Sequence, residues 1–545
     1  MGLSGRRLTA LGESGRAVVR FGNVWQRREA AMIVDDQYAA IAFLSDPKSY
    51  GLDSAVEVIE THISRIFLAG DRAYKMKKAV KLPYVDFSTA TLRLNACRKE
   101  LELNSLTAPG LYLDVKTLVK DNSGTVCFGE EGECIDAVVE MVRFDQDLLF
   151  DRLAIANRLT DDLMTSTARM IVRFHQDAVV AQGLDGAVQM ETVLAINDAG
   201  FATSTVFAKH EVAAFSQLFR DVLKQHWERL RERSAAGKVR RCHGDLHLRN
   251  ICLLDGQPRL FDCIEFNDEI ATVDVLYDLA FLLMDLWHEG HQHHANLVAN
   301  RYFDESDNED AFTLLPFFLA VRAAVRAHVT ATQAETATTD KDKLCAEARH
   351  YFELVKDLLE TKASRLIAIG GLSGVGKTTI AEALSPHIGA PPGARIVESD
   401  RVRKAMHGVS AETHLPKAAY RPEISKKVYA EMVLRTDIIL ADGGCVVADA
   451  VFDDLDHRNA IEATARHRNV QFDGIWLEAD PALLWKRVSG RRGGPSDANI
   501  EVLEMQLARR FNHIEWHKID ASQGVKFICE EILAKAISET AAAGA

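Results

Sequence analysis

The stretch RCHGDLHLRN, residues 241–250, places His243, Asp245 and Asn250 on one short polar segment. It follows a long helical pattern and precedes NICLLDGQPRLFDC, whose alternating apolar residues and Asp-Gly pair predict a hairpin. Reactive side chains are commonly carried on loops that a rigid scaffold positions. The sequence therefore predicts a site formed by this loop and the hairpin that follows it.

The spacing of these residues matches a known catalytic pattern. Protein kinases carry H-R-D-x-x-x-x-N, in which the Asp accepts or orients the proton of an attacking hydroxyl and the Asn binds Mg²⁺. Here Gly244 replaces the Arg, and Asp262 at the end of the hairpin stands where a second metal carboxylate is needed. We expect Asp245 to be the base and Asn250 and Asp262 to bind Mg²⁺. A polar turn without catalytic function is the alternative reading.

A lysine that holds phosphates is expected upstream, paired with a helix glutamate. Residues 57–82 alternate as strands do and contain Gly-Asp at the centre, so they predict a hairpin. Lys75 and Lys77 point to one face of the second strand, and Lys75 is our choice. Its expected partner is Glu100, with Glu102 as the alternative, on a helix predicted over 88–107 and capped by Ser88 or Thr89.

One element of ordinary protein kinases is missing from the sequence. No G-x-G-x-x-G precedes the lysine, and the stretch IETHISRIF contains no glycine. Thr61, His62 and Ser64 are the candidates to cover the phosphates with backbone and hydroxyl donors instead. This departure argues against an ordinary protein kinase.

A second phosphate-handling motif, GGLSGVGKTT, occupies residues 370–379. It satisfies G-x-x-x-x-G-K-[ST], follows the apolar strand LIAI and opens a helix, which is the context of a P-loop. A dinucleotide fingerprint is the alternative for the glycines, but it does not explain the Lys-Thr ending. The residues expected to bind nucleotide are Gly371, Ser373, Gly374, Val375, Gly376, Lys377, Thr378 and Thr379, with Thr378 also holding Mg²⁺.

Two aspartates and two arginines extend this second site. Asp449 follows an apolar strand and is the expected second Mg²⁺ ligand, although many structural strands also end in Asp. The stretch SDRVRKAMHG resembles the substrate side of zeta-toxin-like and gluconate-kinase-like P-loop kinases, which implies that Asp400 contacts, and takes a proton from, the acceptor hydroxyl. Arg487 and Arg491, in a basic stretch, are expected to stabilise the transferring phosphoryl group. A solvated basic helix is the alternative for these arginines.

About residues 32–540 resemble a bacterial group. HGDLHLRN, LFDCIEFND and DVLYDLAFLLMDL are similar to aminoglycoside-phosphotransferase-like kinases, and RAYKMKKAVKLPYVDFST matches bifunctional proteins that add a P-loop ATP-binding domain of the AAA family ATPase kind. The resemblance implies a two-lobed kinase fold with a hinge that binds ATP near Glu140 and Val142. It also implies that Asp274 and Asp278 brace the catalytic loop. It does not establish aminoglycosides as substrates.

The 545 residues divide by pattern into four segments. We expect a disordered tail over 1–31, a kinase-like N-lobe over 32–145, a helical C-lobe over 146–360 and a P-loop kinase or NTPase domain over 361–545. The fold class is therefore an α+β two-lobed protein-kinase-like domain followed by an α/β P-loop domain with a parallel sheet. The arginine-rich tail also allows a transit peptide or an early start codon, since Met32 begins the globular pattern.

The composition of the chain disfavours several classes of binding partner. The net charge of −13 disfavours nucleic-acid binding, and the apolar run VLYDLAFLLMDLW is too short to cross a bilayer. Nine scattered cysteines favour reduced thiols in the cytoplasm, and the histidines of HEGHQHH lack the framework of a zinc site.

These patterns lead to one main reading and two alternatives. We expect an ATP- and Mg²⁺-dependent phosphotransferase with two nucleotide sites, acting on a hydroxyl of a small molecule. The alternatives are a nucleotide-dependent switch that phosphorylates itself or a protein partner, and a degenerate binding module. The module is disfavoured because neither motif lacks a catalytic residue.

Overall fold

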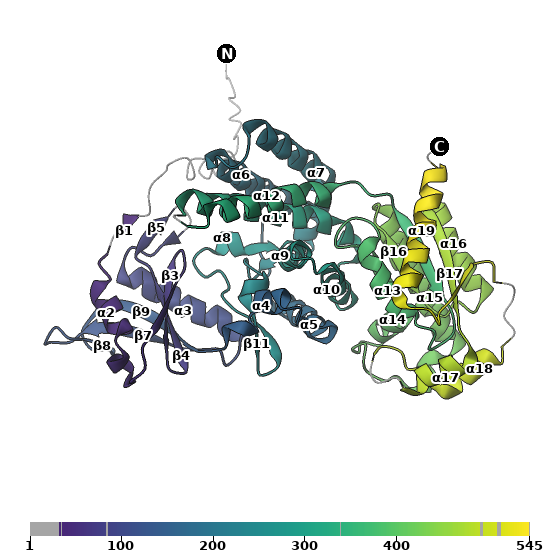
Figure 1. The fold of residues 1–545 in the computed structure, drawn as a ribbon, viewed down its shortest axis with the longest axis horizontal. Helices are drawn as coiled ribbons and strands as arrows, with labels where there is room; N and C mark the ends of the chain where they lie inside the picture. Colours follow the sequence, from purple (N-terminus) through teal and green to yellow (C-terminus); the bar gives the residue numbers. More distant parts are fainter. Residues whose placement is uncertain are drawn as a thin grey trace, which may run out of the picture.

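The structure, a computed structural model, describes residues 32–33, 35–82, 85–337, 339–490, 494–509 and 514–543. Figure 1 shows a sheet-containing lobe in purple, a helical lobe in teal and an α/β domain in green and yellow, in that order across the molecule. The first two parts form the predicted two-lobed kinase-like fold, and the third has the predicted parallel sheet. The predicted tail over 1–31 lies outside the described residues.

Six strands form the antiparallel sheet of the first lobe, in the order β2-β3-β4-β9-β7-β8. Their bounds are β2 Glu57–Glu60, β3 Ser64–Ala69, β4 Arg72–Lys77, β7 Tyr112–Lys120, β8 Val126–Phe128 and β9 Glu133–Val142. The prediction of one hairpin over 57–82 is wrong, because the chain also turns after Thr61. The Thr61 N–H donates to Ser64 O at 2.9 Å, and the Ser64 N–H donates to Thr61 Oγ1 at 3.0 Å. The predicted turn at Gly70, with φ +60°, is present.

Smaller elements complete this lobe. Strands β1 (Met32–Ile33), β5 (Val80–Leu82) and β6 (Val85–Asp86) form a separate three-stranded sheet. Helix α2 (Tyr38–Ser45) packs with Tyr74 and its neighbours on one face of the large sheet, and the 3-10 turn η2 (Pro47–Tyr50) follows it. The opposite face of the large sheet is left for α3.

Helix α3 (Ala90–Thr107) begins where the sequence predicts. The Thr89 side chain caps it by accepting from the Leu92 N–H at 3.3 Å, and threonine is a favoured residue at this capping position. The fully buried Arg93 anchors the helix to the sheet through Asp136, at 2.9 Å. Glu100, two turns further on, is consequently held against the sheet face that carries Lys75.

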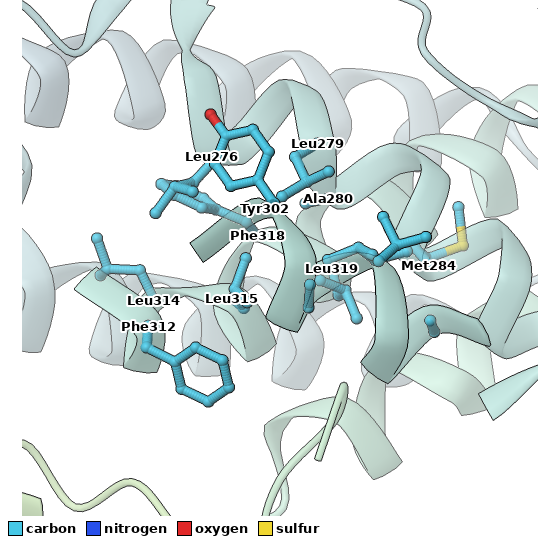
Figure 2. Packing of buried hydrophobic residues seen from close by; sticks show 14 of the residues in the cluster. Leu276, Leu279, Ala280, Met284, Tyr302, Phe312, Leu314, Leu315, Phe318 and Leu319 are labelled. Atoms are coloured by element: carbon cyan, nitrogen blue, oxygen red, sulfur yellow. The ribbon is translucent and has the colours of Figure 1, made fainter. Parts of the chain in front are cut away.

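The second lobe is mainly helical. Its elements are η3 Gln146–Leu148, α4 Phe150–Ile155, α5 Asp161–Asp177, α6 Gly186–Thr203, α7 Lys209–Ala235, β10 Val239–Arg241, η4 Leu248–Asn250, β11 Ile251–Leu254, β12 Gln257–Leu260, α8 Asp268–Ala271, β13 Thr272–Asp274, α9 Val275–His288, α10 Gln292–Asp304, η5 Glu309–Leu314, α11 Leu315–Thr336 and α12 Lys341–Leu359. Figure 2 shows Leu276, Leu279 and Met284 of α9 interleaved with Phe318 and Leu319 of α11. Burial of these apolar side chains is the main stabilising contribution in the lobe.

The loop with Asp245 lies between two short sheets of this lobe. Strand β10 pairs with β13 before the loop, and β11 pairs with β12 after it. The β11–β12 turn uses the predicted Asp255-Gly256, both with positive φ. Both ends of the loop are therefore fixed by strand pairing.

The third part contains five strands in the order β15-β16-β14-β17-β18, all parallel. Its elements are β14 Arg365–Gly370, α13 Lys377–Leu384, η6 Ser385–His387, β15 Arg395–Glu398, α14 Ser399–Met406, η7 Lys417–Tyr420, α15 Pro422–Ala441, β16 Val446–Asp449, α16 Leu455–Arg468, β17 Gln471–Glu478, α17 Pro481–Gly490, α18 Ile500–Leu507, β18 His517–Asp520 and α19 Val525–Ala543. The P-loop follows the central strand β14. In a parallel α/β sheet, this carboxyl edge is where ligands bind.

Among the described residues, one helical stretch, Glu309–Glu335, has the length and apolar composition of a membrane span. Of its 18-residue window, 72% is buried inside the molecule, as in a core helix. All nine cysteines are described, and each is a free thiol.

Candidate active sites

Lys75 lies on β4 and reaches carboxylates from two other elements. Its Nζ is 2.6 Å from Oε1 of Glu100 on α3, and it forms a second ion pair with Asp262 after β12. Burial alone would raise the pKa of Glu100, but its two lysine partners lower it to about 2. Glu102, the alternative partner, is exposed. The structure thus brings the predicted Lys75, Glu100 and Asp262 together.

Lys77 forms a second buried layer behind this pair. Its Nζ is 2.6 Å from Oε2 of Glu100 and also pairs with Glu265. Both lysines face the same side of β4, as strand alternation predicts. Glu265 was not singled out from the sequence, although it follows Asp262 closely in the stretch LFDCIEFND.

The loop that carries Asp245 is braced from below by Asp278 of α9. The Asp278 carboxylate accepts from the His243 N–H through Oδ2 at 3.2 Å and from the Gly244 N–H through Oδ1 at 2.8 Å. The resemblance implied the same role for Asp274, but Asp274 instead pairs with Arg233 of α7 at 2.7 Å. The bracing therefore comes from Asp278, while Asp274 connects α7 to the start of α9.

Asp245 and Asn250 are in direct contact. The Asn250 amide donates to the Asp245 carboxylate at 3.0 Å and to its backbone oxygen at 2.9 Å. Burial raises the pKa of Asp245, yet the nearby His247 and His243 hold it well below its usual range. The Asp245 side chain is therefore an ionised acceptor, as a base or proton-orienting group must be.

The expected hinge residues lie at the end of β9. Glu140 pairs across the sheet with Tyr74, on the face opposite Lys75, and its side chain contacts Tyr74, Arg72 and Lys116. The Glu140 side chain consequently does not reach the sheet face that carries Lys75. The Val142 N–H donates to Leu111 O at 2.9 Å, so this donor is already used.

The residues expected to cover the phosphates form the β2–β3 turn. Thr61 closes this turn with Ser64, whose side chain is buried. His62 is exposed, and its partial desolvation together with the nearby Lys78 lowers its pKa. A short turn closed by a threonine thus occupies the position of a glycine-rich loop.

Arg322 of α11 belongs to the scaffold of the loop. Its guanidinium donates to Gly244 O at 3.3 Å and stacks on Tyr277, with its central carbon 3.8 Å from the ring centre. Its neighbour one turn on, Arg326, contacts Tyr351 Oη at 3.3 Å. Arg322 therefore supports the backbone before Asp245.

The second site is built on the P-loop between β14 and α13. Gly371 and Gly374 have φ of +139° and +85°, and a Cβ on either would lie 2.7 Å from a neighbouring atom. Glycine is required at both positions for this reason. Lys377 Nζ lies 3.4 Å from Leu372 O, folded back over the loop whose backbone donors are expected to hold phosphates.

Thr378 lies between two carboxylates. Its hydroxyl donates to Asp449 Oδ2 at 2.6 Å and lies 3.4 Å from Glu398 Oε1. Burial raises the pKa of Asp449 to about 6 and that of Glu398 to about 8. Glu398 was missed in the sequence, because only the last residue of ARIVESD was read as functional. A hydroxyl and two buried carboxylates form an oxygen set of the kind that Mg²⁺ prefers.

A cavity of about 1340 Å³ opens in front of this set. Asp400 lines it together with Lys377, Thr378 and Asp449, and burial raises the pKa of Asp400 above its ordinary value. Arg403 lines it as well, but its guanidinium donates to Ala419 O at 2.7 Å. The remaining described residues of the P-loop that line the cavity are Ser373, Gly374, Gly376 and Thr379.

Arg487 lies against the backbone of the P-loop. It donates to Val375 O at 2.9 Å and to Ala521 O at 3.0 Å, and so connects the P-loop to the loop after β18. Arg491 lies outside the described residues. The P-loop amide of Ser373 donates to Oε1 of Gln506 on α18 at 2.9 Å, a contact that no local pattern signals.

Two groups set aside in the sequence have structural surroundings. His293 and His294 of HEGHQHH lie 2.9 Å and 3.4 Å from Asp161 on the rim of the helical lobe, and these contacts account for their arrangement. Burial raises the pKa of the Cys252 thiol to about 12 and raises that of Cys242 well above its ordinary value, so neither is a thiolate nucleophile.

Two parts of the chain match the models of known protein families. Residues 156–313 match the model of the phosphotransferase enzyme family, and residues 366–513 match that of an AAA domain. An uncharacterized protein of Mycobacterium tuberculosis is 27% identical over 476 residues, which cover 86% of this chain and 92% of the relative.

Two solved structures resemble single parts of the chain. A choline/ethanolamine kinase family protein from Mesorhizobium loti is 15% identical and covers 59% of this chain and 94% of its own, with a TM-score of 0.38. A gluconokinase from Sinorhizobium meliloti is 21% identical and covers 34% and 97%, with a TM-score of 0.23. The chain thus contains a stretch similar to the phosphotransferase enzyme family, followed by a stretch similar to AAA domains that carries the P-loop.

Proposed function

We propose that the protein is an ATP- and Mg²⁺-dependent phosphotransferase with two nucleotide sites. The kinase-like domain transfers the γ-phosphoryl group to a hydroxyl of a small molecule in the cytoplasm, and the P-loop domain acts as a second kinase or an ATPase. The observation that carries this proposal is the shared lining of the large cavity. Asp400 faces the same space as Lys377, Thr378 and Asp449, so a proton acceptor stands beside a phosphate-binding loop.

In the kinase-like domain, the roles follow from the contacts. Lys75, fixed by Glu100, is placed to bind phosphate oxygens. Asp262 is 40% exposed at its side chain, and with the side-chain oxygen of Asn250 it offers the donors that Mg²⁺ prefers. Bound Mg²⁺ would neutralise charge on the β- and γ-phosphates. Asp245 takes the acceptor's proton as the new P–O bond forms and the bond to ADP breaks.

In the P-loop domain, Thr378 and Asp449 fit the same ion. The raised pKa values of Asp449 and Glu398 reflect buried carboxylates that a cation would stabilise in their ionised forms. Lys377 and the loop amides would hold the phosphates. Asp400, whose pKa burial raises above that of an ordinary carboxyl group, is a stronger base than an exposed carboxylate and is suited to accept the acceptor's proton.

The test is transfer of radiolabel from γ-labelled ATP in a deproteinised cell extract. Wild type is run beside Asp245→Asn and Lys377→Ala. We expect a labelled small molecule that disappears with Asp245→Asn. Loss with Lys377→Ala alone would assign the reaction to the P-loop domain, and loss with both would mean that the sites act in series. Label on the protein alone would favour the regulatory switch and contradict the small-molecule kinase.

A further inference from the structure

The edge strand of the P-loop sheet is completed by the kinase-like domain. Among the strands that the structure describes, β15 pairs with β16 alone, so one row of its backbone groups has no described strand beside it. Two buried asparagines of α10 take that place. Asn296 Nδ2 donates to Ala394 O at 3.0 Å, and the Ile396 N–H donates to Asn300 Oδ1 at 2.7 Å. Figure 1 shows α10 at the boundary between the helical lobe and α13 and α14.

The same boundary contains a buried group of charges. Arg395 of β15 is 1% exposed and lies 2.9 Å from Asp304 and 3.0 Å from Glu309. Among the described residues, both carboxylates that pair with Arg395 belong to the helical lobe. A buried guanidinium without such partners is strongly destabilising. The P-loop domain therefore depends on the kinase-like domain for the charge balance of its own edge strand.

One branch of this group reaches the predicted metal position. Arg401 of α14 lies with Nη1 3.5 Å from Asp304 Oδ2 and with Nε 2.9 Å from Glu398 Oε2. The other oxygen of Glu398 is 3.4 Å from the Thr378 hydroxyl. A continuous line of ion pairs thus runs from Asp304 of the kinase-like domain through Arg401 to Glu398, which lies beside the P-loop.

We propose that Asp304 is a positioning residue for the metal site of the P-loop domain, acting through Arg401 on Glu398. Arg401 is 8% exposed and divides its positive charge between two carboxylates. Without Asp304, the guanidinium would move onto Glu398 and draw that carboxylate away from Thr378. Groups that orient metal ligands in this way typically change metal affinity about 10- to 100-fold when they are removed. The inference rests on the nucleotide and Mg²⁺ binding proposed above.

The test measures binding, not turnover, in the full chain. Mn²⁺ serves as the probe, titrated with ADP in the Asp262→Asn background, so that the metal reports on the P-loop domain. We expect Asp304→Asn to weaken Mn²⁺ binding about ten-fold. ADP binding in the presence of EDTA should stay unchanged, because the line of contacts ends at metal ligands and not at the phosphate-binding amides. Arg401→Lys, which retains the charge but not the two-sided contact, should have the same effect.

Glu309→Gln is the matched control. It removes the other carboxylate of Arg395 from the same buried group, and among the described residues Glu309 forms ion pairs with Arg395 and Arg435 but not with Arg401. We expect it to lower the thermal unfolding midpoint much as Asp304→Asn does, with Mn²⁺ binding retained. The inference would be overturned if Asp304→Asn and Glu309→Gln bound Mn²⁺ with equal affinity. It would also be overturned if neither Asp304→Asn nor Arg401→Lys changed the affinity for Mn²⁺. If the Asp262→Asn protein with Asp304 intact failed to bind Mn²⁺ in the presence of ADP, the proposed function of the P-loop domain would be refuted, and the inference with it.

Discussion

The ammonium group of Lys75 is shared by two carboxylates from different lobes, Glu100 on α3 and Asp262 after the β11–β12 hairpin. The pair with Glu100 fixes the lysine, whereas the pair with Asp262 occupies the carboxylate expected to bind Mg²⁺. Nucleotide binding must therefore replace the Lys75–Asp262 contact with contacts to phosphate and metal. This ion pair joins the two lobes alongside the buried pair of Lys77 and Glu265.

Glu100→Gln should both destabilise the first lobe and abolish transfer by the kinase-like domain. The Glu100 carboxylate forms ion pairs with the buried ammonium groups of Lys75 and Lys77. Removal of one partner from a buried ion pair costs about 3 to 5 kcal/mol of stability. Urea unfolding and the label-transfer assay measure the two effects. Glu102→Gln, an exposed change on the same helix, should leave both unchanged. Equal effects of the two substitutions would contradict the assignment of Glu100.

Asp400→Asn should remove the chemistry of the P-loop domain but not its nucleotide binding. A positioned general base contributes about 10²- to 10⁴-fold to rate, and Asp400 is the carboxylate proposed for that role. Single-turnover transfer and ATP affinity separate the two properties. Asp456→Asn changes an exposed carboxylate that lines the same cavity and is the control. Weaker ATP binding with unchanged turnover in Asp400→Asn would assign this residue to binding.

Gln506→Ala should strengthen nucleotide binding to the P-loop domain. The Gln506 side chain accepts the hydrogen bond of the Ser373 amide, which a phosphate needs. Loss of a hydrogen bond worth about 1 kcal/mol in the free protein corresponds to about five-fold tighter binding. Glu504→Ala, exposed on the same helix, provides the comparison in a calorimetric titration with ADP. Weaker binding in Gln506→Ala would show that Gln506 supports the loop.

Acid should destabilise the helical lobe through His328. Burial lowers the pKa of His328 to about 4, against about 6.5 in an unfolded chain. The unfolded state binds the proton first, so this contribution is complete above pH 6.5 and is lost as the pH falls toward 4. The expected loss is about 2 kcal/mol between about pH 7 and pH 5.

Urea unfolding at both pH values measures this loss. His328→Gln should reduce the difference, and His407→Gln, at an exposed position, should not. An unaltered pH dependence in His328→Gln would assign the acid sensitivity to other groups.

Local patterns predicted the parts of both sites that lie close in sequence. The stretch HGDLHLRN predicted that Asp245 and Asn250 belong to one site, where the structure has them in contact, and the P-loop motif predicted the strand-loop-helix around Lys377. The turn at Thr61 was missed because its closing bond uses a threonine hydroxyl, with neither glycine nor proline to mark it.

Contacts between distant segments could not be read in the same way. Gln506 meets Ser373 across 133 positions, and Asn296 meets Ala394 across 98. A glutamine on a helix or an asparagine in a core carries no sequence pattern that names its partner. The charges at the domain boundary are invisible for the same reason, since Asp304 and Arg401 resemble ordinary surface residues until the domains pack.

The central claim is that one chain holds two nucleotide sites, and binding stoichiometry tests it most directly. Equilibrium dialysis with a non-hydrolysable ATP analogue and Mg²⁺ should give two molecules bound per wild-type chain. Lys377→Ala and Asp262→Asn should each reduce the number to one, and the double variant should bind none. One molecule per wild-type chain, lost with Lys377→Ala and unaffected by Asp262→Asn, would contradict the account of the kinase-like domain.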